Sequence, residues 1–240
     1  MTKIKIPSKS DNEAQLLRNV AGKQFEGMVA RAINEILNRE GIFAASLKQL
    51  NDLIRRDPAF GQVLEFAKTP VRNPCDQNYQ MMLPDTDVLV YYVQKDHAGF
   101  VRKRYHLATV SCKVSFHGRE TESTFWAKVL GNHGSKFYLA TEDKFGELGA
   151  CEDGKKVRRL VESYMDFTYL MNQYGSPTNS LEKDIAKFYD LFENSKRSSY
   201  QRQNTRIFDS RRAEGKYCKR VRPFDDLLFD LMQLTFEFKR

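Results

Sequence analysis

Two acidic residues and a lysine stand at the ends of strand-like segments in the middle of the chain. Asp85 and Asp87 lead into the apolar run 88–93, and Lys113 lies on the run 105–116. Charged groups lose their hydration when they are buried separately, so these are expected to share one site. Carboxylates are oxygen ligands for Mg²⁺, and a lysine beside the metal can orient water and stabilise charge on a phosphate. The combination predicts metal-assisted hydrolysis of a phosphodiester.

Three elements must position these groups. The β-branched and aromatic run from Asp87 through residue 93 predicts a strand covered on both faces. Alternation over 105–116 directs Thr109, Ser111 and Lys113 to one face of a second strand. A helix with Thr121 as its N-cap follows, with Glu122 on its inward side. The apolar stripe of that helix is expected to comprise Phe125, Trp126, Val129 and Leu130.

These motifs resemble a known family. Pro84-Asp85 with Asp87, then Ser111-Cys112-Lys113 and Glu122, is similar to the PD-(D/E)xK nuclease superfamily and, within it, to type II restriction endonucleases. Ser111 replaces the acid that usually stands two residues before the lysine. In the subset that cuts sites containing CCGG, a serine takes this place and a helical glutamate supplies the missing carboxylate.

The second carboxylate has three candidates. Glu122 is the nearest match to the displaced glutamate, although it follows Lys113 by only nine residues. Glu120 is an alternative on the same segment. Glu26 is the third, because these nucleases often place an acid from the first core helix near the metal.

The resemblance implies a mechanism and a partner. Asp87, or Asp85 as the literal match to the Pro-Asp motif, and the second carboxylate would hold Mg²⁺, with a backbone carbonyl near Cys112 as a further ligand. Lys113 would orient the attacking water. Cleavage of double-stranded DNA would leave 5′-phosphate and 3′-hydroxyl ends, and a homodimer would match a palindromic site. Arg119-Glu120 is similar to the element with which the subset reads guanine and cytosine, without its second arginine.

The charge of the chain also indicates a polyanionic partner. The net charge is +8, and the segment 195–222 carries ten basic residues against two acidic ones. A solvated basic loop would have the same composition, but beside a nuclease motif the segment predicts DNA contact. Six of its residues are candidate DNA ligands: Lys196, Arg197, Arg202, Arg206, Arg211 and Arg212.

The 240 residues, 41% hydrophobic, predict an α/β fold with a central mixed sheet flanked by helices. A nuclease core over 1–175 is expected to precede a basic helical region over 176–240, packed on the same domain. Helices are predicted over 11–37, with a possible interruption near Gly22, and over 46–56, 152–174, 181–192 and 224–238, and a strand over 136–141. The last helix needs a partner surface, which could belong to a second subunit.

Composition excludes other classes of protein. Four separated cysteines lack the paired spacing of a zinc site. No apolar run has membrane-spanning length, and the first ten residues lack an export signal, which predicts a soluble cytoplasmic protein of prokaryotic type. No glycine-rich phosphate loop indicates a nucleotide cofactor.

Three functions therefore compete. The first is a sequence-specific restriction endonuclease. The second is a repair or nicking nuclease of the same superfamily that needs no fixed sequence. The third is a catalytically inactive DNA-binding protein in which Ser111 marks the loss of the usual acid.

Overall fold

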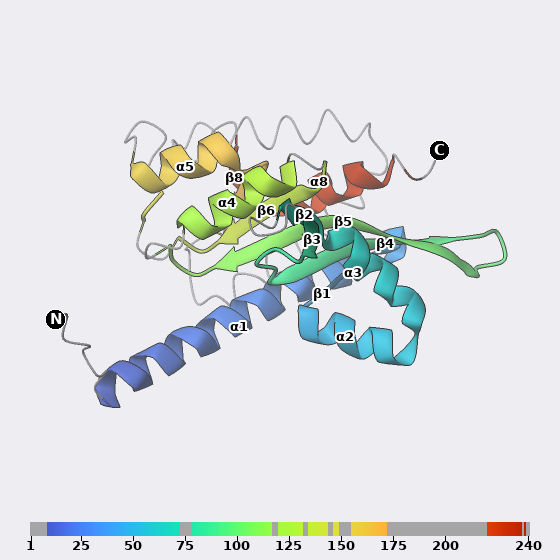
Figure 1. Ribbon diagram of the computed structural model, residues 1–240, viewed down its shortest axis with the longest axis horizontal. Coiled ribbons are helices and arrows are strands. Elements are labelled where there is room, and N and C mark those ends of the chain that lie inside the picture. Colours follow the sequence, from blue (N-terminus) through green and yellow to red (C-terminus); the bar gives the residue numbers. More distant parts are fainter. Residues whose placement is uncertain are drawn as a thin grey trace.

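The computed structural model describes residues 9–72, 78–116, 120–131, 134–143, 146–148, 155–171, 220–236 and 238. Figure 1 shows one twisted sheet with helices on both of its faces. The six strands run in the order β1 (Ile42–Ala45), β4 (Val88–Lys95), β5 (Val101–Lys113), β6 (Lys136–Thr141), β7 (Phe167–Leu170) and β8 (Val221–Pro223). The first three are antiparallel neighbours, and β5 to β8 are parallel. The predicted mixed sheet is confirmed.

The two strands that carry the candidate site form a long hairpin. It projects from the body of the molecule in Figure 1, and Asp96 accepts backbone hydrogen bonds from Ala98 and Phe100 at its turn. The structure starts β4 one residue after Asp87. It also begins β5 four residues before the predicted strand and ends it at Lys113. The start of β4 and the end of β5 therefore both lie at the candidate residues.

Alternation along the strands divides the interior into three clusters. The even-numbered residues Val88 and Val90 of β4 pack with α1 (Lys9–Leu37) and α8 (Asp225–Thr235) on one face. The odd-numbered Leu89 and Tyr91 pack with α2 (Leu47–Arg56) and α3 (Gly61–Ala67) on the other. Further along that second face, Leu139 of β6 packs with α4 (Glu120–Gly131) and α5 (Lys156–Tyr164). The sheet is the middle of three layers.

Local sequence explains several boundaries. Ser46 and Gln49 form a reciprocal capping box at the start of α2. The short 3-10 helices η1 (Asn38–Glu40) and η2 (Pro58–Phe60) adjoin α1 and α3. Gly41 follows η1 with φ +80°, and an added Cβ would come within 3.0 Å of the Val93 carbonyl oxygen. Only glycine fits this left-handed, crowded position.

The first helix is continuous through Gly22, so the interruption considered there is absent. Among the side chains described from residue 19 onward, Phe25 is the first buried one, and the amino-terminal part of the helix extends past the sheet in Figure 1. The segment from Phe25 to Leu37 lies against the core, and Glu26 directly follows the first of these buried residues.

The prediction of one long helix over residues 152–174 is wrong. Residues 156–164 form α5, but 167–170 form strand β7. The guanidinium of Arg220 donates to the carbonyl oxygens of Met165 and Ser163 and so ends the helix. Because that partner lies more than fifty residues away in sequence, local periodicity could not reveal the break.

The C-terminal helix finds its partner within the same chain. Leu227, Leu228 and Leu231 are buried against the α1 side of the sheet, so a second subunit is not needed to cover them. The helix is shorter than predicted, from Asp225 to Thr235, and strand β8 precedes it. Residues 172–219, including the predicted helix over 181–192, lie outside the described part of the chain.

Partial burial of His106 predicts a pH-dependent stability. Burial lowers the pKa of His106 to about 4 from its ordinary 6.5, and its Nε2 lies 3.2 Å from Thr109 Oγ1. Between pH 4 and 6.5 His106 takes up a proton in the unfolded chain but not in the folded one. The free energy of unfolding therefore keeps the whole contribution of His106 above pH 6.5 and decreases as the pH falls toward 4. We expect about 1–2 kcal/mol to be lost, because partial exposure reduces the full effect of the shift.

Urea unfolding of the wild type and of His106→Gln at pH 7.5 and 4.5 measures this contribution. The variant should lose less stability on acidification than the wild type. His97→Gln, on the exposed turn of the hairpin, is the control and should behave as the wild type. Equal losses in all three proteins would contradict the assignment.

Candidate active site

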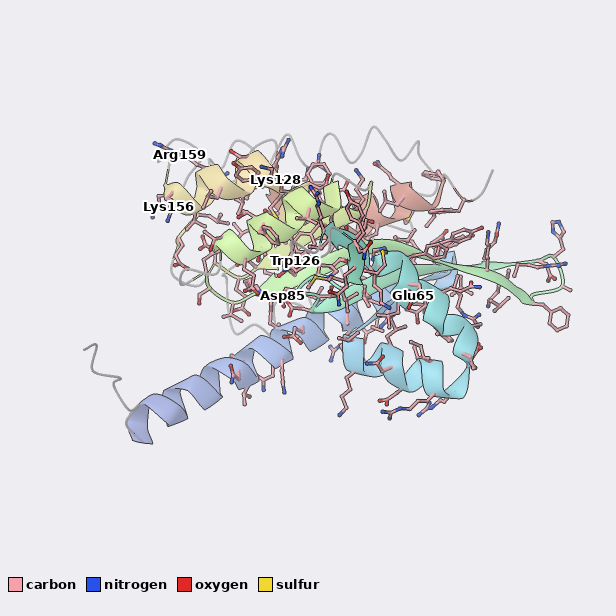
Figure 2. All side chains as sticks on the ribbon, viewed as in Figure 1. Glu65, Asp85, Trp126, Lys128, Lys156 and Arg159 are labelled. Carbon is pink, nitrogen blue, oxygen red and sulfur yellow. The ribbon has the colours of Figure 1, made fainter. Side chains whose placement is uncertain are left out.

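The antiparallel register of β4 and β5 brings the acids to the lysine. Val88 pairs with Val110, so the residues before Val88 lie beside the end of β5. Lys113 Nζ lies 3.1 Å from Asp85 Oδ2 and 3.4 Å from Asp87 Oδ2. The structure thus brings together three of the predicted site residues, Asp85, Asp87 and Lys113. Figure 2 labels Asp85 at this end of the two strands.

Hydrogen bonds hold the carboxylate of Asp87 in place. Its Oδ2 accepts from the backbone N–H of Cys112 at 2.6 Å and from Ser111 Oγ at 3.3 Å. Ser111 is fully buried and therefore orients the acid. Within the described residues no donor reaches Asp87 Oδ1, so that oxygen can accept a further ligand.

Lys113 is buried but charged. Only 8% of it is exposed. Burial alone would lower the pKa of Lys113, but the Asp87 and Asp85 carboxylates outweigh it and raise the pKa. The ammonium group therefore carries its proton at neutral pH, which suits it to stabilise negative charge and to orient water.

The charges of this cluster shift the pKa of Glu26. Burial raises the pKa of Glu26, the nearby carboxylates of Asp87 and Asp85 raise it further, and Lys113 and Lys23 act in the opposite direction. A helix from the start of the chain thus adds a third acidic side chain to the electrostatics of the two strands.

Glu122 does not take the inward position predicted for it. It is exposed on α4, and the carboxylates that act on the pKa of Lys113 are Asp87 and Asp85. The predicted stripe is right in part, because Leu130 is buried and Trp126 packs against the same cluster. It is wrong for Phe125, which is 55% exposed, while Ser123, Thr124 and Ala127 are buried. Small side chains let the helix approach β6 closely and turn the large aromatic ring outward. The helix already includes Thr121, which therefore is not its N-cap.

Cys112 contributes its backbone to the site. Its thiol packs in the cluster on the α1 side, and burial raises the pKa of this thiol well above its ordinary value. A protonated, buried thiol is a poor ligand for a hard cation, so only the backbone of Cys112 suits such a role. Among the described residues, no three acidic, histidine or cysteine side chains already form a metal-binding group.

Two acidic residues that the sequence analysis did not select, Asp143 and Glu147, stabilise the loop next to the site through hydrogen bonds. Asp143 is buried with φ 47° and accepts hydrogen bonds from the backbone N–H groups of Glu147 and Leu148. Glu147 in turn accepts from the backbone N–H of Phe116 at 2.7 Å. The segment after β6 therefore supports the turn after Lys113. Only the position of Asp143, two residues after the end of β6, could have indicated this role.

Two exposed basic side chains lie near the same end of the parallel strands as Lys113. Lys156 and Arg159 are exposed at the start of α5, and Figure 2 labels both at that end of the helix. Lys155 donates to the Gly146 carbonyl oxygen at 2.8 Å and so ties α5 to the loop that supports Phe116.

Some of the predicted DNA ligands lie outside the described residues. They are Arg119, Lys196, Arg197, Arg202, Arg206, Arg211 and Arg212. Glu120 begins α4, but its side chain is not among those described.

A family model described as BsaWI restriction endonuclease type 2 matches residues 64–198, more than half of the chain. The chain belongs to this family. The match includes both site strands, so the predicted resemblance to type II restriction endonucleases is confirmed. No curated protein sequence matches the chain.

Two solved structures are similar to this BsaWI family member. One is described as a pre-specific BsaWI–DNA complex, with 14% identity, a TM-score of 0.43, and coverage of 70% of this chain and 58% of that one. The other is described as a specific AgeI–DNA complex, with 17% identity, a TM-score of 0.45, and coverage of 69% and 58%. The chain thus spans somewhat over half the length of these enzymes.

None of its described helices is both long and apolar enough to cross a membrane.

Proposed function

We propose that this protein is a site-specific endodeoxyribonuclease that hydrolyses double-stranded DNA with Mg²⁺ and leaves 5′-phosphate ends. The observation that carries the proposal is the contact of buried, charged Lys113 with Asp85 and Asp87 at the shared end of β4 and β5. Membership of the BsaWI family supports the reaction class.

Asp87, Asp85 and Glu26 are the residues that would hold the metal. Their oxygens are the hard donors that Mg²⁺ prefers, and Asp87 Oδ2 is already fixed by Cys112 while Oδ1 faces no described donor. When bound, the cation lowers the pKa of water and stabilises charge on the phosphate. Glu26 replaces Glu122 in this proposal because it interacts with the charges of the cluster.

The residues of the chain supply the remaining steps. Lys113 keeps its proton and orients the attacking water toward phosphorus, and its charge stabilises the extra negative charge of the transition state. Ser111 and the Cys112 N–H hold Asp87 so that its geometry does not relax during the reaction. Pre-arranged charges of this kind act without reorganisation cost.

We also propose that the protein acts as a homodimer, because its substrate is a duplex with two strands to cut. The proposed location is the cytoplasm. Each subunit offers one Lys113 cluster, and a two-fold dimer would present one cluster to each strand of a palindromic site. Sedimentation with and without DNA measures the stoichiometry.

Digestion of plasmid and phage DNA with and without Mg²⁺ tests the proposed activity. Discrete fragments that require the cation are expected, and sequencing their ends identifies the site and the 5′-phosphate. Smears or nicks would favour the repair or nicking nuclease. Intact DNA with retained binding would favour the inactive DNA-binding protein.

We predict that Lys156 and Arg159 contact DNA phosphates. Both are exposed on α5, near the end of the parallel strands β5 and β6 where Lys113 lies. Replacing both with alanine should reduce the slope of log affinity against log salt by about 2, because each lost phosphate contact releases about one counterion fewer. Fluorescence anisotropy at several salt concentrations measures the slope.

The matched control removes two charges elsewhere. Lys48→Ala with Arg56→Ala alters exposed residues of α2, which packs near the opposite edge of the sheet. Its slope should equal that of the wild type. Equal slopes for both double variants would contradict a phosphate contact at α5.

A further inference from the structure

A two-stranded ribbon outside the main sheet exposes apolar side chains. Strands β2 (Thr69–Arg72) and β3 (Tyr79–Met82) pair with each other in antiparallel register, and with no other strand in the described part of the chain. All four residues of β3 are exposed, with Tyr79 70%, Met81 50% and Met82 39% accessible. Exposed aromatic and methionine side chains gathered on one short element indicate a contact surface.

The register assigns the side chains of the ribbon to two faces. Thr69 is fully buried and pairs with Met82, so that face turns toward the protein at its base. Alternation places Pro70, Arg72, Tyr79 and Met81 on the opposite face. Three of these four side chains are apolar or aromatic, so the outward face is unlike the basic start of α5.

The ribbon leads directly into the candidate active site. Only Leu83 and Pro84 separate Met82 from Asp85, which limits the two Cα atoms to about 11 Å. Pro84 is buried, and its carbonyl oxygen accepts a hydrogen bond from Thr86 Oγ1 at 2.8 Å. The base of the ribbon is therefore anchored next to the acids.

We infer that the β2–β3 ribbon inserts into a groove of the DNA duplex beside the cleaved phosphodiester and reads bases there. The inference depends on the proposed function, because a phosphodiester held at Asp85 and Lys113 brings the neighbouring base pairs to the ribbon. A two-stranded ribbon fits the major groove, where apolar side chains contact the thymine methyl group. Tyr79 and Met81 are the reading residues on the outward face, whereas Gln80, which is also exposed, lies on the other face of the ribbon.

This role predicts a signature different from that of a phosphate contact. Loss of Tyr79 or Met81 should change the preference among sequences and leave the salt slope intact, since neither side chain is charged. Loss of Lys156 and Arg159 should do the reverse. The two surfaces can therefore be separated on the same substrates.

The experiment compares Tyr79→Ala and Met81→Ala with Phe100→Ala. Phe100 is 71% exposed at the tip of the β4–β5 hairpin, at the far end of the two site strands, and is a matched loss of an exposed apolar side chain. The probes are short duplexes that carry the site cut by the wild type and all single base-pair changes within and beside it. The ratio of cleavage rates between the intact site and each altered duplex is measured for every variant.

At one or more positions this ratio should fall about tenfold in the ribbon variants, the loss typical of one base contact. Phe100→Ala should keep all wild-type ratios. Irradiation of duplexes that carry 5-iodouracil should also crosslink residues 79–82 of the full-length protein to the base at the affected position. Urea midpoints equal to the wild type establish that the variants fold.

Unchanged ratios in both ribbon variants, with wild-type cleavage intact, would overturn the inference and leave the proposed function standing. Crosslinks confined to other segments would overturn it as well. A changed oligomeric state with unchanged ratios would assign the ribbon to a protein contact instead. If the wild type itself neither binds nor cuts any duplex, the proposed function fails first, and that result is distinguishable from the others.

Discussion

Lys113→Ala is expected to abolish DNA cleavage while DNA binding is retained. The ammonium group contacts both acids and is the buried cation of the cluster, so its removal takes away the charge that orients water and stabilises the transition state. A loss of about 10³-fold in the single-turnover cleavage rate is expected from groups with these roles. Affinity for the duplex should change little, because exposed basic side chains such as Lys156 and Arg159 are expected to supply most of it.

A second variant separates chemistry from folding. Removing a buried charge leaves Asp85 and Asp87 to repel each other, which itself destabilises the protein. Lys113→Gln keeps most of the side-chain volume and can still donate a hydrogen bond, and it should cut as poorly as the alanine variant. Wild-type cleavage by either variant would refute the assigned site.

The second large effect should come from Glu26 and not from Glu122. Glu26→Gln keeps the shape of the side chain but removes the charge that interacts with Asp87 and Lys113. If Glu26 completes the carboxylate set, cleavage at limiting Mg²⁺ should fall about 100-fold or more, as for loss of one strong electrostatic contact at a reaction centre. Titration of the rate with Mg²⁺ measures the change.

Glu122→Gln is the matched control for this prediction. It makes the same chemical change on an exposed helix surface, and its Mg²⁺ titration should follow that of the wild type. A large loss in Glu122→Gln with normal cleavage by Glu26→Gln would restore the displaced helical glutamate as the ligand. A binding measurement without cleavage, in Ca²⁺, shows whether either variant still holds the duplex.

Much of the site could be predicted because its pattern is local. The alternation of β5 directs Ser111 and Lys113 to one face, and the apolar run after Asp87 marks β4; the structure has both strands. Ser111 replaces the usual acid, and in the structure it donates a hydrogen bond to Asp87. The strand β6 and the helix α2 also agree with the sequence pattern.

Other features depended on partners far away in the chain. The break between α5 and β7 needs Arg220, and the short strands β1 and β8 are defined by their neighbours in the sheet. The sequence pattern did not indicate the ribbon of β2 and β3, because Pro70 and an exposed strand give no burial pattern. The orientation of α4 was predicted only in part, because Leu130 and Trp126 face the core as expected but Phe125 is exposed and the small Ser123, Thr124 and Ala127 take the buried positions.

The amino-acid sequence by itself determined the chemistry available to this protein: two acids, a buried-face lysine and a basic chain suited to a nucleic acid. Residue types and a period of two along a strand carry that information locally. The tertiary structure alone placed Glu26, far away in the sequence, where the charges of Asp87 and Lys113 act on its pKa, because α1 packs across the sheet. Helical periodicity specifies a face but not the neighbour it will meet, and that neighbour is chosen by packing over the whole domain.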